Sequence, residues 1–121
     1  MTARTFPEFT PTFPTNRWSL PQVLEHQAAT IGKRPFIKWE DAGPEYTYAE
    51  TNARANRLAR GLQKLGIGHG DCAVLFMPNS LDYLFAWFAL NKLGAIEAPI
   101  NISYKGKFLE HQVNICKAET I

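Results

Sequence analysis

Residues 72–98 read CAVLFMPNSLDYLFAWFALNKLGAIEA and contain the segments that decide the fold. The first six residues are a continuous apolar run without the alternation of a half-exposed strand. Such a run predicts a strand covered on both faces, as in a parallel sheet. A loop at residues 78–80, a helix over residues 81–93 and a short strand over residues 95–98 follow. The order strand, helix, strand predicts a right-handed parallel unit.

The segments after residue 98 continue the same alternation. Residues 101–105 are predicted as a loop and residues 107–116 as a helix. Residues 120–121 are predicted to be the first residues of another strand. The helix over 81–93 is apolar nearly all round, so we expect it to be buried on most sides. A chain of this size buries only ~65% of its unfolded surface, which leaves few elements so enclosed. We therefore expect more protein to follow residue 121; the alternative is a small complete domain with an apolar dimer interface.

Towards the N-terminus the pattern predicts a helix and a hairpin. Ser19 and Gln22 have the spacing of a capping box, and Gly32 ends the helix that they begin. Residues 35–40 and 46–48 are typical of short strands. The turn-forming Asp, Gly and Pro residues between them favour a hairpin.

A second capping box, Thr47 with Glu50, begins a long helix that ends at Gly66. Apolar residues recur along it at helical spacing and predict its buried face. The opposite face is basic and is expected to be solvated. Its members are Arg54, Arg57, Arg60 and Lys64.

The chain is predicted to have two parts, an extended arm over residues 1–18 and a folded part over residues 19–121. Three prolines in the arm fix φ and remove backbone donors, which disfavours helix and central strand. The phenylalanines of the arm are expected to pack on the body; they are Phe6, Phe9 and Phe13. The spacing of Pro11 and Pro14 leaves an SH3-type ligand as the alternative.

The composition excludes several classes of protein. Lys and Arg total 13 against 11 Asp and Glu, giving a net charge of +2, which argues against a nucleic-acid-binding protein. Two cysteines are too few for a disulfide framework and fit a reducing compartment. No apolar stretch reaches the ~18–20 residues that span a bilayer, and the N-terminus lacks the apolar core of a signal peptide. We expect a soluble, cytoplasmic protein.

Few residues are candidates for chemistry. Gly66, Gly68 and Gly70 follow a helix and precede a strand, so they predict a helix cap and turn rather than a dinucleotide loop. Residues 78–80 precede a helix N-terminus, where free N–H groups can bind an anion. Ser80 as an N-cap, with Asp82 in the first turn, explains that loop without a ligand.

The three histidines and two cysteines of the chain do not form a recognisable motif. His26, His69 and His111 are predicted on three different elements, without the spacing of metal ligands. A Cys–His nucleophile from Cys72 or Cys116 is equally weakly supported, and Cys72 is predicted to be buried in a strand, where a thiol is usually inert. The sequence thus predicts no catalytic, cofactor-binding or metal-binding residue in this chain.

Five segments, in chain order, resemble the adenylate-forming enzymes, which include acyl-CoA synthetases, peptide-synthetase adenylation domains and luciferases. The resemblance runs from about residue 19 to residue 121, and the order and spacing of the segments carry it. The segments are residues 46–51 (YTYAET), 52–59 (NARANRLA), 65–71 (LGIGHGD), 77–80 (MPNS) and 93–101 (LGAIEAPIN). Asn101 after Pro99 and Ile100 is similar to acyl-CoA synthetases. Residues 85–88, 94–96 and 99–101 together resemble the carnitine and crotonobetaine CoA-ligase branch. Thr51 departs from the leucine usual at its position.

The resemblance implies an α/β fold in which this chain is the incomplete N-terminal portion of a large adenylate-forming domain. That portion is a small hairpin plus the start of a parallel β-α-β-α sheet. For the parent enzyme it implies ATP, Mg²⁺, coenzyme A and a small carboxylic acid as substrate. The carboxylate attacks the α-phosphate of ATP, and the thiol of coenzyme A then displaces AMP to give a thioester.

The same resemblance implies that the catalytic groups lie outside this chain. The family's Ser/Thr/Gly-rich phosphate loop, aromatic-Gly-x-Thr-Glu motif, ribose-binding Asp and C-terminal Lys have no match in residues 1–121. We therefore expect the chain alone to bind none of these cofactors and to be inactive, with the remainder of the parent domain as its partner. Two alternatives stay open. One is a peptide-synthetase adenylation domain, and the other is a truncated interaction protein that binds a partner through the helix over 81–93.

Overall fold

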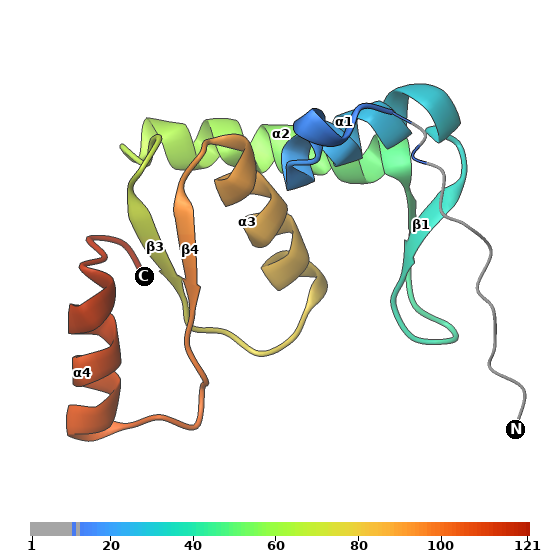
Figure 1. Cartoon of the computed structure of the whole chain (residues 1–121). Coiled ribbons are helices and arrows are strands. Elements are labelled where there is room, and N and C mark those ends of the chain that lie inside the picture. Colours follow the sequence, from blue (N-terminus) through green and yellow to red (C-terminus); the bar gives the residue numbers. More distant parts are fainter. Residues whose placement is uncertain (1–10, 12) are drawn as a thin grey trace, which may run out of the picture.

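A computed structural model of the protein describes residue 11 and residues 13–121. From residue 20 on, the helices and strands follow one another in the predicted order (Figure 1). The elements are η1 (Thr15–Arg17), α1 (Leu20–Ile31), β1 (Pro35–Lys38), β2 (Glu45–Thr47), α2 (Tyr48–Lys64), β3 (Cys72–Leu75), α3 (Leu81–Lys92), β4 (Ile96–Pro99) and α4 (Gly106–Cys116).

The long helix α2 connects two separate groups of strands (Figure 1). It begins directly after the antiparallel hairpin of β1 and β2 and leads into β3. The predicted capping box is confirmed: the Glu50 amide donates to Thr47 Oγ1 at 3.2 Å, and the Thr47 amide donates to Glu50 Oε2 at 2.9 Å. Gly66, with φ of +93°, follows the last turn and ends the helix as predicted.

β3 has a parallel neighbour on each edge. It pairs with β4 along its whole length. On its other edge Ala73 forms a parallel bridge with Thr120, whose carbonyl accepts a hydrogen bond from the Val74 amide at 2.9 Å. After β3 the chain crosses through α3 to β4 on one edge of β3. It then crosses back through α4 to Thr120 on the other edge of β3. α3 and α4 lie on opposite sides of the strand pair (Figure 1), as two right-handed crossovers in opposite directions would place them.

The core consists of two clusters that both include residues of α3. Leu90 packs with the apolar residues of β3 and the turn before it, whereas Phe88 packs against α1 and α2. Leu90 is 1% exposed, and burying a leucine stabilises the fold by about 2–3 kcal/mol. The buried members of the two clusters are Ile67, Ala73, Leu75 and Leu90, and Leu24, Ala55 and Phe88.

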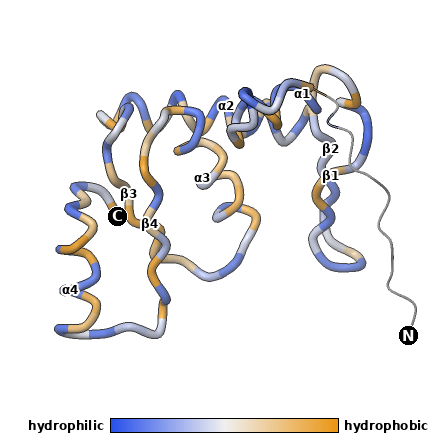
Figure 2. The backbone as a smooth tube through the Cα atoms, in the orientation of Figure 1, coloured by the Kyte–Doolittle hydropathy of each residue, from blue (hydrophilic) through white to orange (hydrophobic). Residues whose placement is uncertain are grey.

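The expectation that residues 81–93 are buried on most sides is confirmed. Of the residues of α3, only Asp82 is exposed, because α1, α2 and β4 cover the helix. An exposed apolar surface was expected there under the interaction-protein alternative, whereas the apolar side chains of α3 are buried or half-buried. Large exposed apolar side chains lie elsewhere, among them Phe108 (54%) and Ile115 (61%) on α4, whose alternating hydropathy Figure 2 shows.

Two expectations near the N-terminus differ from the structure. Ser19 is the N-cap of α1, but its side chain accepts no capping hydrogen bond, so the capping box with Gln22 is wrong. Pro21 occupies the second helical position and has no N–H to donate, which removes one of the two donors a cap uses. Of the arm expected over residues 1–18, residues 1–10 and 12, with Phe6 and Phe9, lie outside the described residues.

The described part of the arm is not extended throughout. Thr15–Arg17 form one 3₁₀ turn, closed by a hydrogen bond from the Arg17 amide to the Pro14 carbonyl at 3.0 Å. Phe13 does pack on the body: its ring stacks on His26 of α1 with centroids 4.3 Å apart. In the described part of the chain, no helix is both long and apolar enough to cross a membrane.

Candidate functional site

A hollow of about 420 Å³ at the carboxyl ends of β3 and β4 is the candidate site. Parallel α/β sheets bind ligands outside the carboxyl ends of their strands. The hollow is lined by residues that end or follow the two strands, together with one residue from the first turn of α3. They are Met77, Pro78, Asn79, Tyr83, Pro99, Ile100, Asn101 and Ile102.

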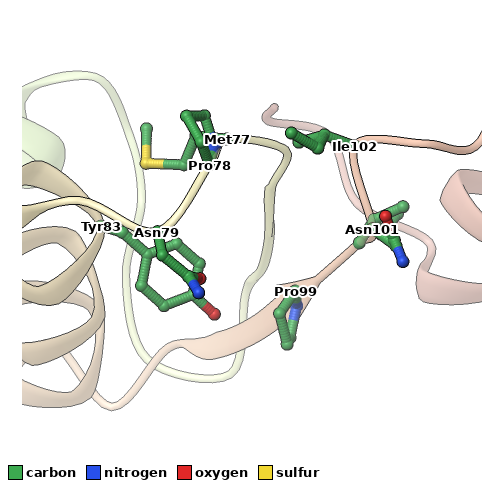
Figure 3. A pocket seen from close by; sticks show the side chains of 8 residues that line it. Met77, Pro78, Asn79, Tyr83, Pro99, Asn101 and Ile102 are labelled. Atoms are coloured by element: carbon green, nitrogen blue, oxygen red, sulfur yellow. The ribbon is translucent and has the colours of Figure 1, made fainter.

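The two walls of the hollow come from different segments (Figure 3). Asn79 and Tyr83 stand together on one side, Asn101 and Ile102 stand on the other, and Pro99 lies between them. The first wall is positioned by the helix cap, because the Tyr83 amide donates to Ser80 Oγ at 3.1 Å. The predicted N-cap role of Ser80 is thereby confirmed. Asp82 in the first turn adds a negative charge at the same helix end, which disfavours an anion there.

The second wall is a turn built around Asn101. Asn101 Oδ1 accepts a hydrogen bond from the Ser103 amide at 2.9 Å, and the Asn101 carbonyl accepts one from the Tyr104 amide at 3.0 Å. The side-chain oxygen of Asn101 therefore already accepts a hydrogen bond from the backbone of its own turn, as is common for Asn in turns.

Glu97 of β4 and Tyr83 form an electrostatic pair beside the hollow. Burial raises the pKa of Glu97, and its buried Oε2 has no hydrogen-bond partner among the described residues. Burial also raises the pKa of Tyr83, and the nearby Glu97 carboxylate raises it further. Sequence reasoning missed both residues. Neither residue carried a signal in the sequence, because the run predicted to be covered on both faces is residues 72–77 and includes neither of them.

The lining of the hollow is uncharged at neutral pH. Its polar groups are two amides and one phenol, and its described lining residues include no Lys, Arg, His, Asp or Glu. A nucleotide phosphate needs cationic or backbone N–H donors, and Mg²⁺ needs carboxylate oxygens. The side chains that line the hollow thus supply neither a cation for a phosphate nor a carboxylate for Mg²⁺, and no catalytic step is assigned to them.

The other residues considered from the sequence lie outside this hollow. Gly66, Gly68 and Gly70 form the predicted turn, in which the Gly68 amide donates to Asp71 Oδ2 at 2.7 Å and the Gly70 amide donates to the Gly94 carbonyl at 2.9 Å. The three histidines lie on α1, on this turn and on α4. No group of three or more His, Cys, Asp or Glu residues in the described chain could hold a metal ion.

The family of known proteins described as "AMP-binding enzyme" matches residues 24–121. The chain is 33% identical over 108 residues to a medium/long-chain-fatty-acid–CoA ligase of Mycobacterium tuberculosis, covering 89% of this chain and 18% of that protein. It is 30% identical over 108 residues to a crotonobetaine/carnitine–CoA ligase of Proteus mirabilis, covering 87% and 21%. It is also 36% identical over 90 residues to surfactin synthase subunit 1 of Bacillus subtilis, covering 74% and 2%.

A solved structure with the same architecture is the inhibitor-bound N-terminal domain of FACL13 from Mycobacterium tuberculosis. It aligns with a TM-score of 0.77 at 29% sequence identity, over 83% of this chain and 25% of that chain. The chain thus spans about a fifth or less of the length of these curated relatives.

Proposed function

The chain belongs to the AMP-binding enzyme family, and on that premise we propose that it is the N-terminal part of an ATP-dependent acyl-CoA ligase. In the first step of the reaction a carboxylate attacks the α-phosphate of ATP and releases pyrophosphate. In the second step the thiol of coenzyme A displaces AMP to form a thioester. The observation that carries the proposal is the family match over residues 24–121, together with the similarity to proteins named as CoA ligases.

Within such an enzyme the chain supplies scaffold. Its capping box, turn glycines and paired strands β3 and β4 support the carboxyl ends of a parallel sheet, the edge at which α/β enzymes bind ligands. Because the hollow there is uncharged, the groups that stabilise charge on a phosphate are expected from other parts of the parent protein. The chain alone is proposed to bind neither ATP, Mg²⁺ nor coenzyme A and to have no activity.

The acid substrate is proposed only as a class, a small carboxylic acid. One relative is named for fatty acids and another for crotonobetaine and carnitine, so the relatives differ in this property. An adenylation domain of a peptide synthetase is the second candidate, and the similarity to surfactin synthase subunit 1 favours it. In that case a carrier-protein thiol replaces coenzyme A as the acceptor.

The test begins with the complete reading frame that contains this sequence. The purified product is assayed for carboxylate-dependent exchange of pyrophosphate into ATP across a panel of acids. Thioester formation is then measured with coenzyme A. Exchange followed by a coenzyme A thioester supports the ligase. Exchange without transfer to coenzyme A favours the adenylation domain, and absence of exchange with every acid argues against both.

The isolated 121-residue chain is the matched control. We expect no pyrophosphate exchange and no change in its unfolding temperature on addition of MgATP, because no side chain that lines the hollow is a cation. Exchange by this chain above background would contradict the assignment of catalysis to the rest of the protein.

A further inference from the structure

The two cysteines of the chain, far apart in sequence, lie at the same groove. Cys72 is the first residue of β3, and Cys116 is the last residue of α4. Both line a groove of about 490 Å³ on the opposite end of the sheet from the candidate site. Each is partly exposed, and neither is in a disulfide. A small reagent in solvent can therefore reach this pair.

The backbone holds the two residues together. Lys117 has a φ of +50°, which turns the chain back directly after Cys116. The following residues then run beside β3, where Thr120 bridges Ala73, the neighbour of Cys72. Strand pairing thus brings the end of α4 beside the start of β3.

The thiols are close enough to interact. Burial raises the pKa of the Cys72 thiol, and the neighbouring Cys116 thiol raises it further. The shared groove and the strand pairing beside it favour a disulfide between the two thiols. A metal site is a poorer fit, because no third His, Cys, Asp or Glu ligand joins the two thiols in the described chain.

We propose that Cys72 and Cys116 form a reversible intramolecular disulfide when the protein meets a peroxide. One thiolate sulfur attacks a peroxide oxygen and breaks the O–O bond, which leaves a sulfenic acid and, after protonation, one water. The second thiol sulfur attacks the sulfenic sulfur, forms the S–S bond and releases a second water. The two thiols together lose two electrons, and hydrogen peroxide is reduced to two waters. A thiol reductant reverses the bond by exchange.

The disulfide would fix the end of α4 to the start of β3. It would therefore hold the segment after α4 in register on the second edge of β3, where the Val74 amide donates to Thr120. Because the attacking species is a thiolate, and burial raises the pKa of the Cys72 thiol, the reaction is expected to accelerate as the pH rises.

The experiment uses the 121-residue chain, in which these are the two cysteines present. The chain is treated with hydrogen peroxide, and free thiols, intact mass and the non-reducing peptide map are followed. We expect monomers that lose both thiols and two hydrogen atoms, with Cys72 and Cys116 peptides linked. The variants C72S and C116S should stop at a sulfenic acid that dimedone traps, with no mass loss of this kind.

The contribution of the fold is measured by repeating the oxidation in denaturant at the same pH. Once a sulfenic acid has formed, the fold should close the disulfide about tenfold faster than in the denatured chain, so the ratio of disulfide to dimedone-trapped sulfenic acid should be about tenfold higher in the native chain. A second readout is hydrogen exchange of the Val74 amide, which should slow about tenfold on oxidation and recover with dithiothreitol. An equal ratio of disulfide to trapped sulfenic acid in native and denatured chains, disulfide-linked dimers in place of the monomeric product, or unchanged exchange at Val74 would overturn the proposal.

Discussion

Lys92 Nζ lies 2.9 Å from Glu25 Oε1 and joins the last residue of α3 to the middle of α1. The two side chains differ in exposure: Lys92 is 6% exposed and Glu25 is 57% exposed. A buried ammonium has lost most of its hydration, so the partner that replaces this hydration matters more than in an ordinary surface pair. The pair therefore links the two helices at a point where one charge has few other partners.

Replacing Glu25 with Gln is expected to lower the free energy of unfolding by about 1–2 kcal/mol, because the Lys92 charge stays buried without its counter-ion. Urea titration of the chain measures the change. In the K92M background the same E25Q substitution should cost much less, since no buried charge remains. An equal cost in both backgrounds would show that the ion pair has no coupling energy.

The hydroxyl of Thr51 is expected to destabilise the fold. Thr51 is fully buried in α2, and its Oγ1 has no hydrogen-bond partner among the described residues. The variant T51V keeps the shape and removes the hydroxyl, so unfolding should become harder by about 1 kcal/mol. T51S is the matched control, which keeps the hydroxyl and removes a buried methyl, and it should be less stable than wild type. A destabilised T51V would indicate that the hydroxyl is satisfied in solution.

Glu97 should make the protein less stable at neutral pH than at acid pH. Burial raises its pKa in the folded state above the ordinary value of 4.5. Between these two pKa values the folded state binds more protons than the unfolded state, so stability falls as the pH rises. E97Q removes the buried charge and should be more stable than wild type at pH 7. The difference should vanish below pH 4.5, and thermal unfolding across this range is the measurement.

Glu50 should have the opposite pH dependence. Hydrogen bonds from the Thr47 amide and hydroxyl lower its pKa from the ordinary value of 4.5. The stabilisation is therefore present above pH 4.5 and is lost as the pH falls through the folded-state value. At pH 7 wild type should be more stable than E50Q, and the two should converge in acid. A gap that stays constant down to pH 3 would contradict this account of the capping box.

The turn at Gly94 should tolerate an added methyl group less well than Gly66. Both glycines have positive φ, +68° and +93°, so alanine at either is strained by about 1–2 kcal/mol. At Gly94 a Cβ would also lie 2.5 Å from His69 Cδ2, whereas Gly66 has nothing within 4 Å. G94A should therefore lose more stability than G66A in urea titrations. Adding H69A should bring G94A close to G66A, and failure to do so would mean that the contact with His69 is not the cause.

Much of the fold follows from local sequence signals. The apolar run at Cys72, the capping residues and the turn glycines specify the order of the elements, because each acts within a few residues. Contacts between residues that are far apart in the sequence could not be predicted from such local signals. The basic face of α2 is exposed as predicted, yet the Arg54 guanidinium also lies 4.5 Å from the centre of the Tyr46 ring. Nothing local to Arg54 identifies that ring as its neighbour.

The candidate site was predicted only in part, for the same reason. The loop before α3 was identified, and the cap at Ser80 follows from its residue type. The second wall around Asn101 comes from a loop after the next strand, so it reaches the site only through strand pairing. Glu97 and Tyr83 gave no signal because an acid in a short strand and a tyrosine in an apolar helix are both ordinary in isolation.

The arrangement of β3 between β4 and Thr120 has a consequence for the order of synthesis. The central strand leaves the ribosome before either of the segments that pair with its two edges. β4 follows one helix later, and Thr120 follows two helices later. At translation rates of about 5–20 residues per second, the apolar run of β3 waits on the order of seconds with both edges open. The nascent chain is thus most vulnerable to edge-to-edge pairing with other chains during that interval, and a chaperone that covers β3 would act then.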